Sequence, residues 1–399
     1  MPHVPGSEAA RARAIKRHLW SERQRFVVTC PLGVEALLAA EVAALAGVAG
    51  VSVRPGGAVF DAPFDTLYAA LLRLRLAESL RVVLLDNAAA GSFPMLFDHL
   101  TRVNWSLWLP ERCAITARVV SRRSRLRDRE GLEQALRGAL RRHGVDPDAA
   151  DGPPMTLHLR LEHDRVSAAL DLGGALYRRA GDKWVSRATI RETTAAALVA
   201  VAERAAGDAP SDLVFDPFCG SGTLLAESLE LALGLDAGRR RRPPFEASPA
   251  WNAGRFRQAE RDSAAEGRGG QPAAHVGSDA DPGAVAIARR NLGAAGLLEH
   301  ARLEVARAQA LDLAEIASEH EAQRPLLLSN PPYGKAATAI GAPPDELLLG
   351  VLSRARGWRF ALLYPDADVL SQHPGIDVEQ RSPVVTGGLR NAVILGSVR

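Results

Sequence analysis

The first part of the chain mixes two kinds of apolar spacing. Short runs in which apolar and polar residues alternate predict strands, and apolar residues three and four positions apart predict helices with one buried face. The predicted strands cover 25–30, 81–87 and 113–120, a hairpin within 51–62 that turns at Gly56-Gly57, and a strand pair within 155–172. The predicted helices cover 33–46, 64–80 and 130–143. This mixture predicts one or two small α+β units.

The pattern changes after residue 173. Short, almost wholly apolar runs, typical of strands buried on both faces, now alternate with helical periods. The predicted strands cover 213–216, 275–279, 301–305, 326–330 and 359–364, and the predicted helices cover 188–205, 223–234, 282–296 and about 345–356. The alternation predicts a doubly wound α/β sheet of mostly parallel strands. An Arg- and Pro-rich insertion covers about 236–270, and residues 378–398 predict an antiparallel hairpin around Gly387-Gly388.

Length and composition agree with this division into domains. A chain of 399 residues exceeds one ordinary core, and 47% hydrophobic with 24% charged residues is typical of a globular protein. The change of pattern places the boundary near residue 172. We therefore expect a flexible lead-in over 1–24, an α+β module over 25–172 and an α/β domain over 173–399.

Three further features bear on where the protein works. No apolar run is long enough to span a bilayer, and residues 1–25 lack the apolar core of a secretory signal. Cys30, Cys113 and Cys219 are odd in number and widely scattered, without the close spacing of a zinc site. We expect a cytoplasmic protein with no structural metal and no membrane partner.

The cationic residues are almost all arginine and they are clustered. Lysine occurs only at 16, 183 and 335, and the net charge is only +3. Arginine clusters lie at 121–129, 136–144 and 238–245, and arginine is suited to bidentate contact with phosphate. Solvated helix faces explain any one cluster equally well, but three together favour a polyanionic partner. The candidate phosphate contacts are Arg122, Arg123, Arg125, Arg127, Arg141 and Arg142.

The first candidate site is the turn "DPFCGSGTLL" at 216–225. A strand is predicted to end at Asp216 and a helix to begin near Thr223, with glycines that let the backbone approach a ligand closely. The turn has neither a Walker lysine nor the G-x-G-x-x-G spacing, so it does not favour a phosphate cradle. A ligand with a cationic amino-acid end and a nucleoside end fits better. The candidate contacts are Asp216, Pro217, Phe218, Gly220, Ser221, Gly222 and Thr223.

The second candidate site is "GSDADP" at 277–282. An acidic residue at the tip of the next strand is where a doubly wound sheet binds ribose hydroxyls, and Asp279 has that position. Ala280 follows it directly. Asp281 is expected to cap the helix that starts at Pro282.

The third candidate site is "SNPPYG" at 329–334, at the end of a predicted buried strand. Two prolines cannot continue a strand interior, but they stiffen a loop. An exocyclic amine on a planar base is a poor nucleophile, and the side-chain oxygen of Asn330 and the carbonyl of Pro331 can both accept hydrogen bonds from it. Pro332 holds the loop, and Tyr333 offers a face on which a base can stack. These residues predict methylation of an amine, with alignment supplying most of the acceleration.

The three motifs in this order resemble those of class I amino-methyltransferases that use S-adenosylmethionine (SAM). The stretch "ALDLGGALYRRAGDKW" and the helix "RATIRETTAAAL" resemble the THUMP-domain RNA guanine-N2 methyltransferases, most closely the members acting on large-subunit 23S ribosomal RNA. The resemblance covers roughly residue 26 to the end. It implies a seven-stranded class I sheet with a C-terminal antiparallel hairpin, preceded by a ferredoxin-like and THUMP module in which THUMP covers about 60–171.

The resemblance also implies roles for single residues. Asp216 and the glycine turn would bind SAM, Asp279 its ribose, and the stretch from Thr189 to Glu192 would close over its methionine end. The sequence departs from the family at two places. Gln309 stands where an acidic residue near the adenine is usual, with Asp312 beyond as the alternative, and Lys335 follows the acceptor loop in place of the family's arginine.

Other functions share parts of this sequence. A tRNA guanine-N2 methyltransferase has the same organisation. DNA amino-methyltransferases share the Asn-Pro-Pro-Tyr loop, but no recognition insertion of sufficient size follows Tyr333. Protein-glutamine methyltransferases lack an RNA-type N-terminal module, and a non-catalytic RNA-binding factor has no need of Asn330. We therefore expect a SAM-dependent RNA methyltransferase with an RNA partner, acting as a monomer.

Overall fold

The computed structural model describes residues 8–180, 183–185, 190–207, 209–267, 269–333, 343–365, 368–386 and 389–399. The chain divides into two compact units. Unit 1 comprises the described residues of Met1–Thr29, Leu38–Leu176 and Arg241–Ser263. Unit 2 comprises those of Cys30–Leu37, Tyr177–Arg240 and Ala264–Arg399. The predicted Gly387-Gly388 turn lies outside the described residues.

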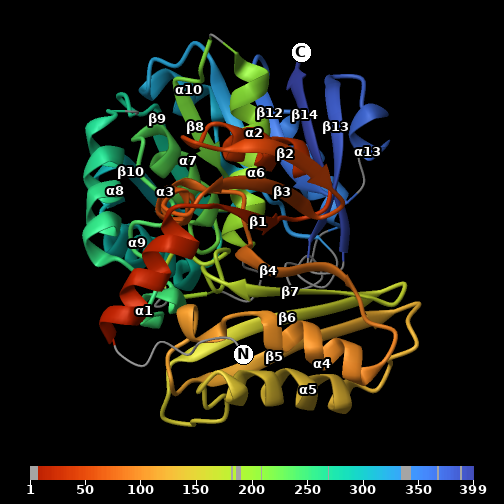
Figure 1. The fold of residues 1–399 in the computed structure, drawn as a ribbon. Coiled ribbons are helices and arrows are strands. Elements are labelled where there is room, and N and C mark those ends of the chain that lie inside the picture. Colours follow the sequence, from red (N-terminus) through yellow and green to blue (C-terminus); the bar gives the residue numbers. More distant parts are fainter. Residues whose placement is uncertain are drawn as a thin grey trace. The chain divides into compact units, whose positions relative to one another are not determined.

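Unit 1 is built on one seven-stranded sheet with the order β2-β3-β1-β4-β7-β6-β5 (Figure 1). Neighbouring strands of this sheet pair antiparallel, except β5 and β6, which pair parallel. The strands are β1 (Arg23–Thr29), β2 (Ala49–Arg54), β3 (Gly57–Pro63), β4 (Ser79–Ala89), β5 (Ala114–Arg122), β6 (Pro154–Glu162) and β7 (Arg165–Asp171). Because β4 pairs with both β1 and β7, the α+β pattern of the sequence forms one continuous sheet.

The helices of unit 1 include three that the periodicity did not predict: α1, α4 and α8. α4 and α5 lie side by side, with α4 against β4 and α5 against β5 (Figure 1). The helical segments are α1 (Glu8–Ile15), η1 (Lys16–Trp20), α2 (Glu35–Ala43, mostly in unit 1), α3 (Thr66–Arg73), α4 (Phe93–Arg102), η2 (Trp105–Leu107), α5 (Arg129–Arg142), η3 (Pro244–Ala247) and α8 (Ala253–Ala265).

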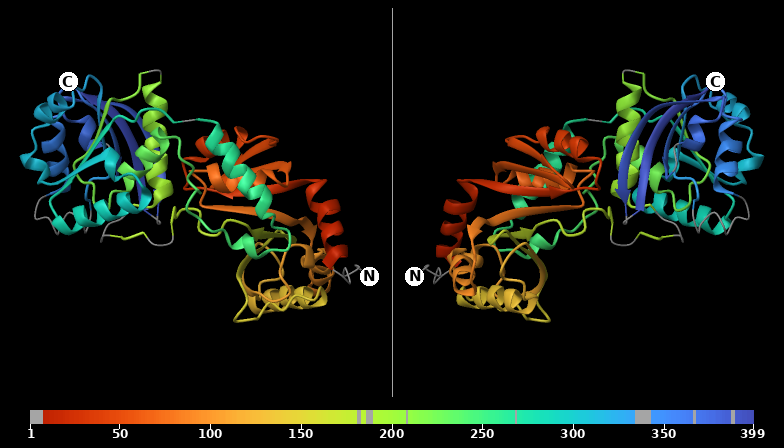
Figure 2. Two further views of the ribbon diagram at one scale, coloured as in Figure 1. Left: turned by 90° about the vertical axis from the view of Figure 1, so that its left-hand side faces the viewer. Right: turned by 90° about the vertical axis from the view of Figure 1, so that its right-hand side faces the viewer.

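Part of the insertion predicted at 236–270 belongs to unit 1. An aromatic ring of this insertion packs edge-on against a ring of α3: the ring centroids of Trp251 and Tyr68 lie 5.0 Å apart. The hydroxyl of Tyr68 accepts a hydrogen bond from the backbone nitrogen of Asn252 at 2.9 Å. Figure 2 shows α8 alongside the strands of this unit. A segment that is polar in sequence is therefore anchored by its few aromatic residues.

Unit 2 is built on a second seven-stranded sheet with the order β10-β9-β8-β11-β12-β14-β13. The first five strands run parallel, and β14 is antiparallel to both β12 and β13. The strands are β8 (Leu213–Asp216), β9 (Ala274–Asp279), β10 (Ala301–Val305), β11 (Pro325–Ser329), β12 (Arg359–Tyr364), β13 (Ile376–Thr386) and β14 (Leu389–Val398). The prediction of a doubly wound class I sheet that ends in an antiparallel hairpin is confirmed.

Two apolar cores hold the helices of unit 2 on the sheet. One packs α12 against β8, β11 and β12, and the other packs α7 and α9 against β9 and β10. The helical segments are α6 (Glu192–Ala206), α7 (Thr223–Ala232), α9 (Pro282–Ala295), η4 (Leu298–His300), η5 (Ala308–Ala310), α10 (Leu313–Glu319), α12 (Pro344–Leu352) and α13 (Asp368–Ser371). Within the described part of the chain, no helix has the length and apolarity needed to cross a membrane.

Candidate active site

The glycine turn joins β8 to α7 and lies close to α9. Gly220 and Gly222 have φ angles of 53° and 78°, in the region that favours glycine. A Cβ atom added at Gly222 would lie 3.2 Å from the Cβ of Ala288 in α9. The sequence therefore needs glycine here for both the backbone conformation and the close helix contact.

Asp279, at the end of β9, braces the same turn. Its carboxylate accepts hydrogen bonds from the backbone nitrogens of Gly220 at 3.0 Å and Asp281 at 2.9 Å. Asp281 caps α9 as predicted, accepting from the nitrogen of Gly283 at 2.8 Å. Ala280 is exposed. Because each carboxylate oxygen of Asp279 has a second lone pair, it can still accept from a diol.

Asp216 connects the ends of two neighbouring strands. Its Oδ1 accepts hydrogen bonds from the hydroxyl of Ser329, at the end of β11, at 2.6 Å and from the nitrogen of Phe218 at 3.1 Å. Burial raises the pKa of the Asp216 carboxyl to about 7. Pro217 beside it is buried, and Phe218 packs against the α12 side of the core. Asp216 thus places the glycine turn next to the start of the acceptor loop.

Asn330 follows a strand whose residues are all buried. Its Oδ1 atom is itself buried and has no hydrogen-bond partner among the described residues. A buried acceptor left without a donor costs about 1–3 kcal/mol, so the position favours a ligand that donates. Pro331 is buried and Pro332 is half-buried. The loop therefore presents an unsatisfied oxygen next to the strand that carries Asp216.

Tyr333 is held in place by β12 and β14. Its hydroxyl accepts a hydrogen bond from Nδ2 of Asn391 at 3.2 Å, and its ring meets Tyr364 edge-on with centroids 6.1 Å apart. Burial raises the pKa of the Tyr333 hydroxyl. The side chain is half-buried, so part of the ring is exposed while its hydroxyl end is fixed.

The residues considered for the adenine differ in what they already bind. Gln309 lies in η5 and is exposed. Asp312 caps α10, accepting from the backbone nitrogens of Ala314 and Glu315 at 3.0 and 3.1 Å. Both of these hydrogen bonds use Oδ1, so Oδ2 of Asp312 can still accept from an adenine amine, and Gln309 and Asp312 both stay candidates. Thr189 and Lys335 lie outside the described residues.

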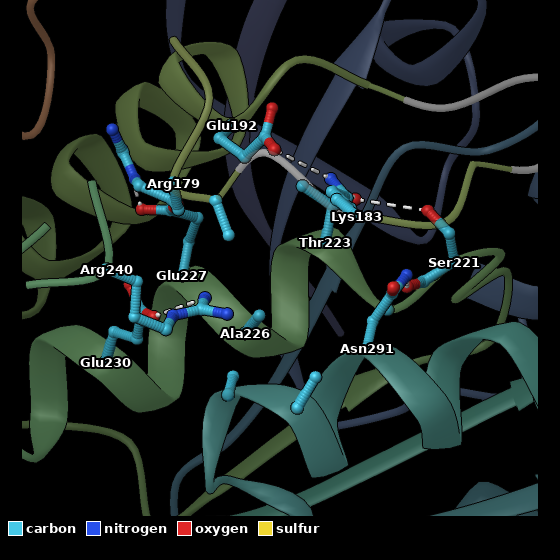
Figure 3. Close-up of a pocket in the computed structure, with 14 residues that line it drawn as sticks. Arg179, Lys183, Glu192, Ser221, Thr223, Ala226, Glu227, Glu230, Arg240 and Asn291 are labelled. Atoms are coloured by element: carbon cyan, nitrogen blue, oxygen red, sulfur yellow. Dashed lines mark hydrogen bonds and ion pairs between the residues drawn. The ribbon is translucent and has the colours of Figure 1, made fainter. Parts of the chain in front are cut away.

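A pocket lies between α7, α9 and the described residues of the segment 177–185, which are 177–180 and 183–185 and which we call the strap (Figure 3). The predicted residues Glu192, Ser221, Gly222 and Thr223 line it, whereas Asp216, Asp279 and Asn330 do not. Glu192 pairs with Lys183 of the strap, with Nζ and Oε1 3.2 Å apart. This pocket therefore contains only part of the predicted cofactor site.

The strap binds to α7 through a buried ion pair. Arg179 donates from Nε and Nη2 to the two carboxylate oxygens of Glu227 in α7, at 2.7 and 3.0 Å. The side chains are only 4% and 1% exposed. Burial lowers the pKa of Lys183, which also donates to the hydroxyl of Thr223 at 2.9 Å.

The predicted phosphate-binding arginines are all exposed, in and after β5 and at the end of α5. Some already have partners: Arg125 pairs with Asp164 at 2.9 Å, Arg141 pairs with Asp148, and Arg142 stacks over the ring of Phe97 at 5.2 Å. Arg127 donates to the carbonyl of Ser124 at 3.1 Å. Arg122 and Arg123 make no ion pair with any described residue, so their charges face solvent.

Two family models match this chain. Residues 180–354 match the family model described as "RMKL-like, methyltransferase domain", and residues 25–82 match the RlmL ferredoxin-like domain. The chain carries an RMKL-like methyltransferase domain. The first match thus contains the glycine turn, Asp279 and the acceptor loop, and the second covers β1 to the start of β4.

Curated relatives match much of the chain, and solved structures share its fold. The chain is 31% identical to "Ribosomal RNA large subunit methyltransferase K/L" of Marinobacter nauticus over 84% of its own length and 48% of the relative. It spans about half the length of the curated relatives it matches. The structure of a possible methylase from Clostridium difficile 630 has a TM-score of 0.79 at 20% identity, covering 95% of this chain and 99% of that one. SMU.472, a candidate methyltransferase complexed with SAH, has the same TM-score and coverage at 23% identity.

Several residues around the methyltransferase site were missed by the sequence analysis. Ser329 and Asn291 gave no signal, because single polar residues at a strand end or on a helix are common. Arg179 could have been found, because the stretch "ALDLGGALYRRAGDKW" quoted for the family resemblance contains a Leu-x-x-Arg pattern that runs from Leu176 to Arg179. Its burial against Glu227 gives that pattern a physical reason.

Proposed function

We propose that this chain transfers a methyl group from SAM to the exocyclic N2 amine of a guanine in structured RNA, with 23S ribosomal RNA as the acceptor. The observation that carries the proposal is the buried Oδ1 of Asn330 after β11, which has no hydrogen-bond partner in the described part of the chain. The methyltransferase fold and the name of the Marinobacter relative support the reaction class and the RNA. Such an enzyme acts in the cytoplasm, and we propose that it works as a monomer.

The residues present fit SAM. The glycine turn from Gly220 to Gly222 admits a close ligand, and Asp279 has lone pairs for the ribose hydroxyls. When bound, SAM supplies an electrophilic methyl group. Asn330 would accept a hydrogen bond from the guanine amine, and the carbonyl of Pro331 a second one.

The acceptor loop would act on the amine before any bond forms. Two acceptors on one NH2 group draw its lone pair out of the ring plane and aim it, and the rigid prolines hold those acceptors in place beforehand. Transfer to the aligned amine would form the N–C bond as the S–C bond of bound SAM breaks, with SAH as the other product. The methylated amine then loses its extra proton to water, so no side chain needs to act as a strong base. Tyr333, fixed at its hydroxyl end, would stack on the extruded base.

Unit 1 would bind the RNA backbone through its exposed arginines. Phosphate contacts position a nucleic acid without reading its sequence, which suits an acceptor selected by shape. Arg122 and Arg123 are the best placed electrostatically because their charges are not neutralised by an ion pair among the described residues.

The test offers three acceptors side by side: 23S rRNA that lacks the modification, total tRNA, and double-stranded DNA. Labelled SAM is the donor, and the product nucleoside is identified by mass spectrometry. We expect N2-methylguanine in 23S rRNA. Labelling of tRNA alone would move the acceptor to the alternative RNA class, and N6-methyladenine in DNA would contradict an RNA enzyme. SAM binding without transfer to any acceptor would favour a non-catalytic factor.

A further inference from the structure

The strap contacts the glycine turn through the side chain of Lys183 (Figure 3). Lys183 donates to the hydroxyl of Thr223, and the hydroxyls of Thr223 and Ser221 lie 3.2 Å apart. Ser221 and Thr223 are both buried. The strap therefore reaches the two hydroxyl residues that flank Gly222.

Asn291, in α9, connects the strap to the backbone of the turn. Its Nδ2 donates to the carbonyl oxygens of Ser221 and Trp184, each at 2.9 Å. Its Oδ1 accepts from the backbone nitrogen of Trp184 at 3.0 Å. An amide has two donor hydrogens and an acceptor oxygen, and this arrangement uses all three. A carboxylate of the same shape has no hydrogen to donate to either carbonyl.

The residue next to Asn291 strengthens the same attachment. The guanidinium of Arg290 lies 3.5 Å from the ring centroid of Trp184, within the range of a cation–π contact. Trp184 is 48% exposed, so burial alone does not hold it. Two neighbouring residues of α9 thus bind the backbone and the ring of one strap residue.

We propose that Asn291 is a positioning residue that fixes the glycine turn in the conformation that receives SAM. The carbonyl of Ser221 lies between two glycines with positive φ, where few steric restraints limit how the backbone turns. The hydrogen bond from Asn291 supplies that restraint and ties it to the strap. The proposal rests on the proposed function, because it takes this turn as the SAM-binding turn.

The decisive variant is Asn291→Asp, which keeps the size and the acceptor for Trp184 but removes both donors. Isothermal titration without RNA measures the dissociation constant of SAM. Amide hydrogen exchange of residues 219–223 measures the turn directly, without any ligand. We expect SAM binding about three- to tenfold weaker, as for loss of a net hydrogen bond, with faster exchange in the turn and a kcat close to wild type at saturating SAM.

Two comparison variants sharpen the result. Arg290→Ala loosens the strap without touching the carbonyl of Ser221, so its effect on SAM binding should be smaller. Glu299→Gln, on the exposed η4, should change nothing. The proposal is overturned if Asn291→Asp binds SAM like the wild type, or if only its unfolding midpoint falls while exchange in the turn is unchanged. A wild-type chain that fails to bind SAM would refute the proposed function, while the exchange measurement would still decide the role of Asn291.

Discussion

At the scale of single residues, the buried carboxyl of Asp216 has a consequence for stability. Its pKa is raised to about 7 in the folded chain, against about 3.9 in an unfolded one. The folded state therefore binds more protons between these values, and this group's contribution to stability falls as pH rises from about 4 to about 7. Above pH 7 it causes no further change.

The substitution Asp216→Asn should remove the loss of stability that accompanies ionisation of this carboxyl. The amide introduced by the substitution cannot ionise, and its oxygen can still accept from the hydroxyl of Ser329. We expect the variant to gain stability relative to wild type by roughly 1–3 kcal/mol between pH 5 and pH 8. Urea unfolding at the two pH values measures this. Parallel pH curves for the two proteins would show that Asp216 does not titrate in this range.

At the scale of elements, the strap and α7 depend on one buried ion pair. Removing Arg179 breaks this ion pair and leaves the carboxylate of Glu227 buried, which costs about 3–5 kcal/mol. We expect Arg179→Met to lower the free energy of unfolding by that amount, and the double variant Arg179→Met/Glu227→Met to recover most of it. Urea unfolding supplies both values.

The exposed pair Arg302–Glu319 is the control for that prediction. Its side chains are 54% and 44% exposed, and such pairs contribute about 0–1 kcal/mol. Arg302→Met should therefore change stability little. If Arg179→Met were as mild as Arg302→Met, the strap would not be held by its ion pair.

The same scale shows what the sequence could predict. The strands of unit 2 were located well because buried parallel strands are almost wholly apolar; β8 and β11 are apolar up to their last residues, Asp216 and Ser329. Helix α4 was missed because its apolar residues Phe93 and Met95 are exposed, so the apolar positions do not mark a single buried face. The single sheet of unit 1 depends on β4 pairing with both β1 and β7, and apolar spacing carries no information about pairing.

The candidate site divides in the same way. Residues next to strand ends, such as Asp279 and Asn330, were predictable because parallel strands end at one edge of a sheet. The partners of such residues were not predictable, because Ser329 bonds to Asp216 only as a result of the pairing of β8 with β11. Asn291 meets Ser221 only through the packing of α9 on the turn.

At the scale of the whole molecule, the account predicts how RNA affinity depends on salt. Each neutralised phosphate steepens the fall of affinity with salt, so losing one contact should lower the slope by about one. We expect Arg122→Ala and Arg123→Ala to have this effect. Arg125→Ala and Arg141→Ala should lower the slope less, because those side chains already pair with Asp164 and Asp148.

Filter binding of 23S rRNA fragments at several salt concentrations measures the slopes. Arg112→Ala is the matched control in the same unit, since Arg112 is exposed, pairs with Asp151 and lies outside the predicted clusters. Equal slopes for Arg112→Ala and Arg122→Ala would mean that the cluster after β5 does not contact phosphates.

The central claim is that Asn330 activates the amine and does not hold SAM. The most direct measurement is the single-turnover rate of methyl transfer by Asn330→Ala, taken together with its SAM dissociation constant. We predict a rate at least about a hundredfold lower with SAM affinity within about twofold of wild type, and a smaller loss for Asn330→Asp, which keeps an acceptor. An unchanged rate, or an equal loss of rate and SAM affinity, would contradict the account.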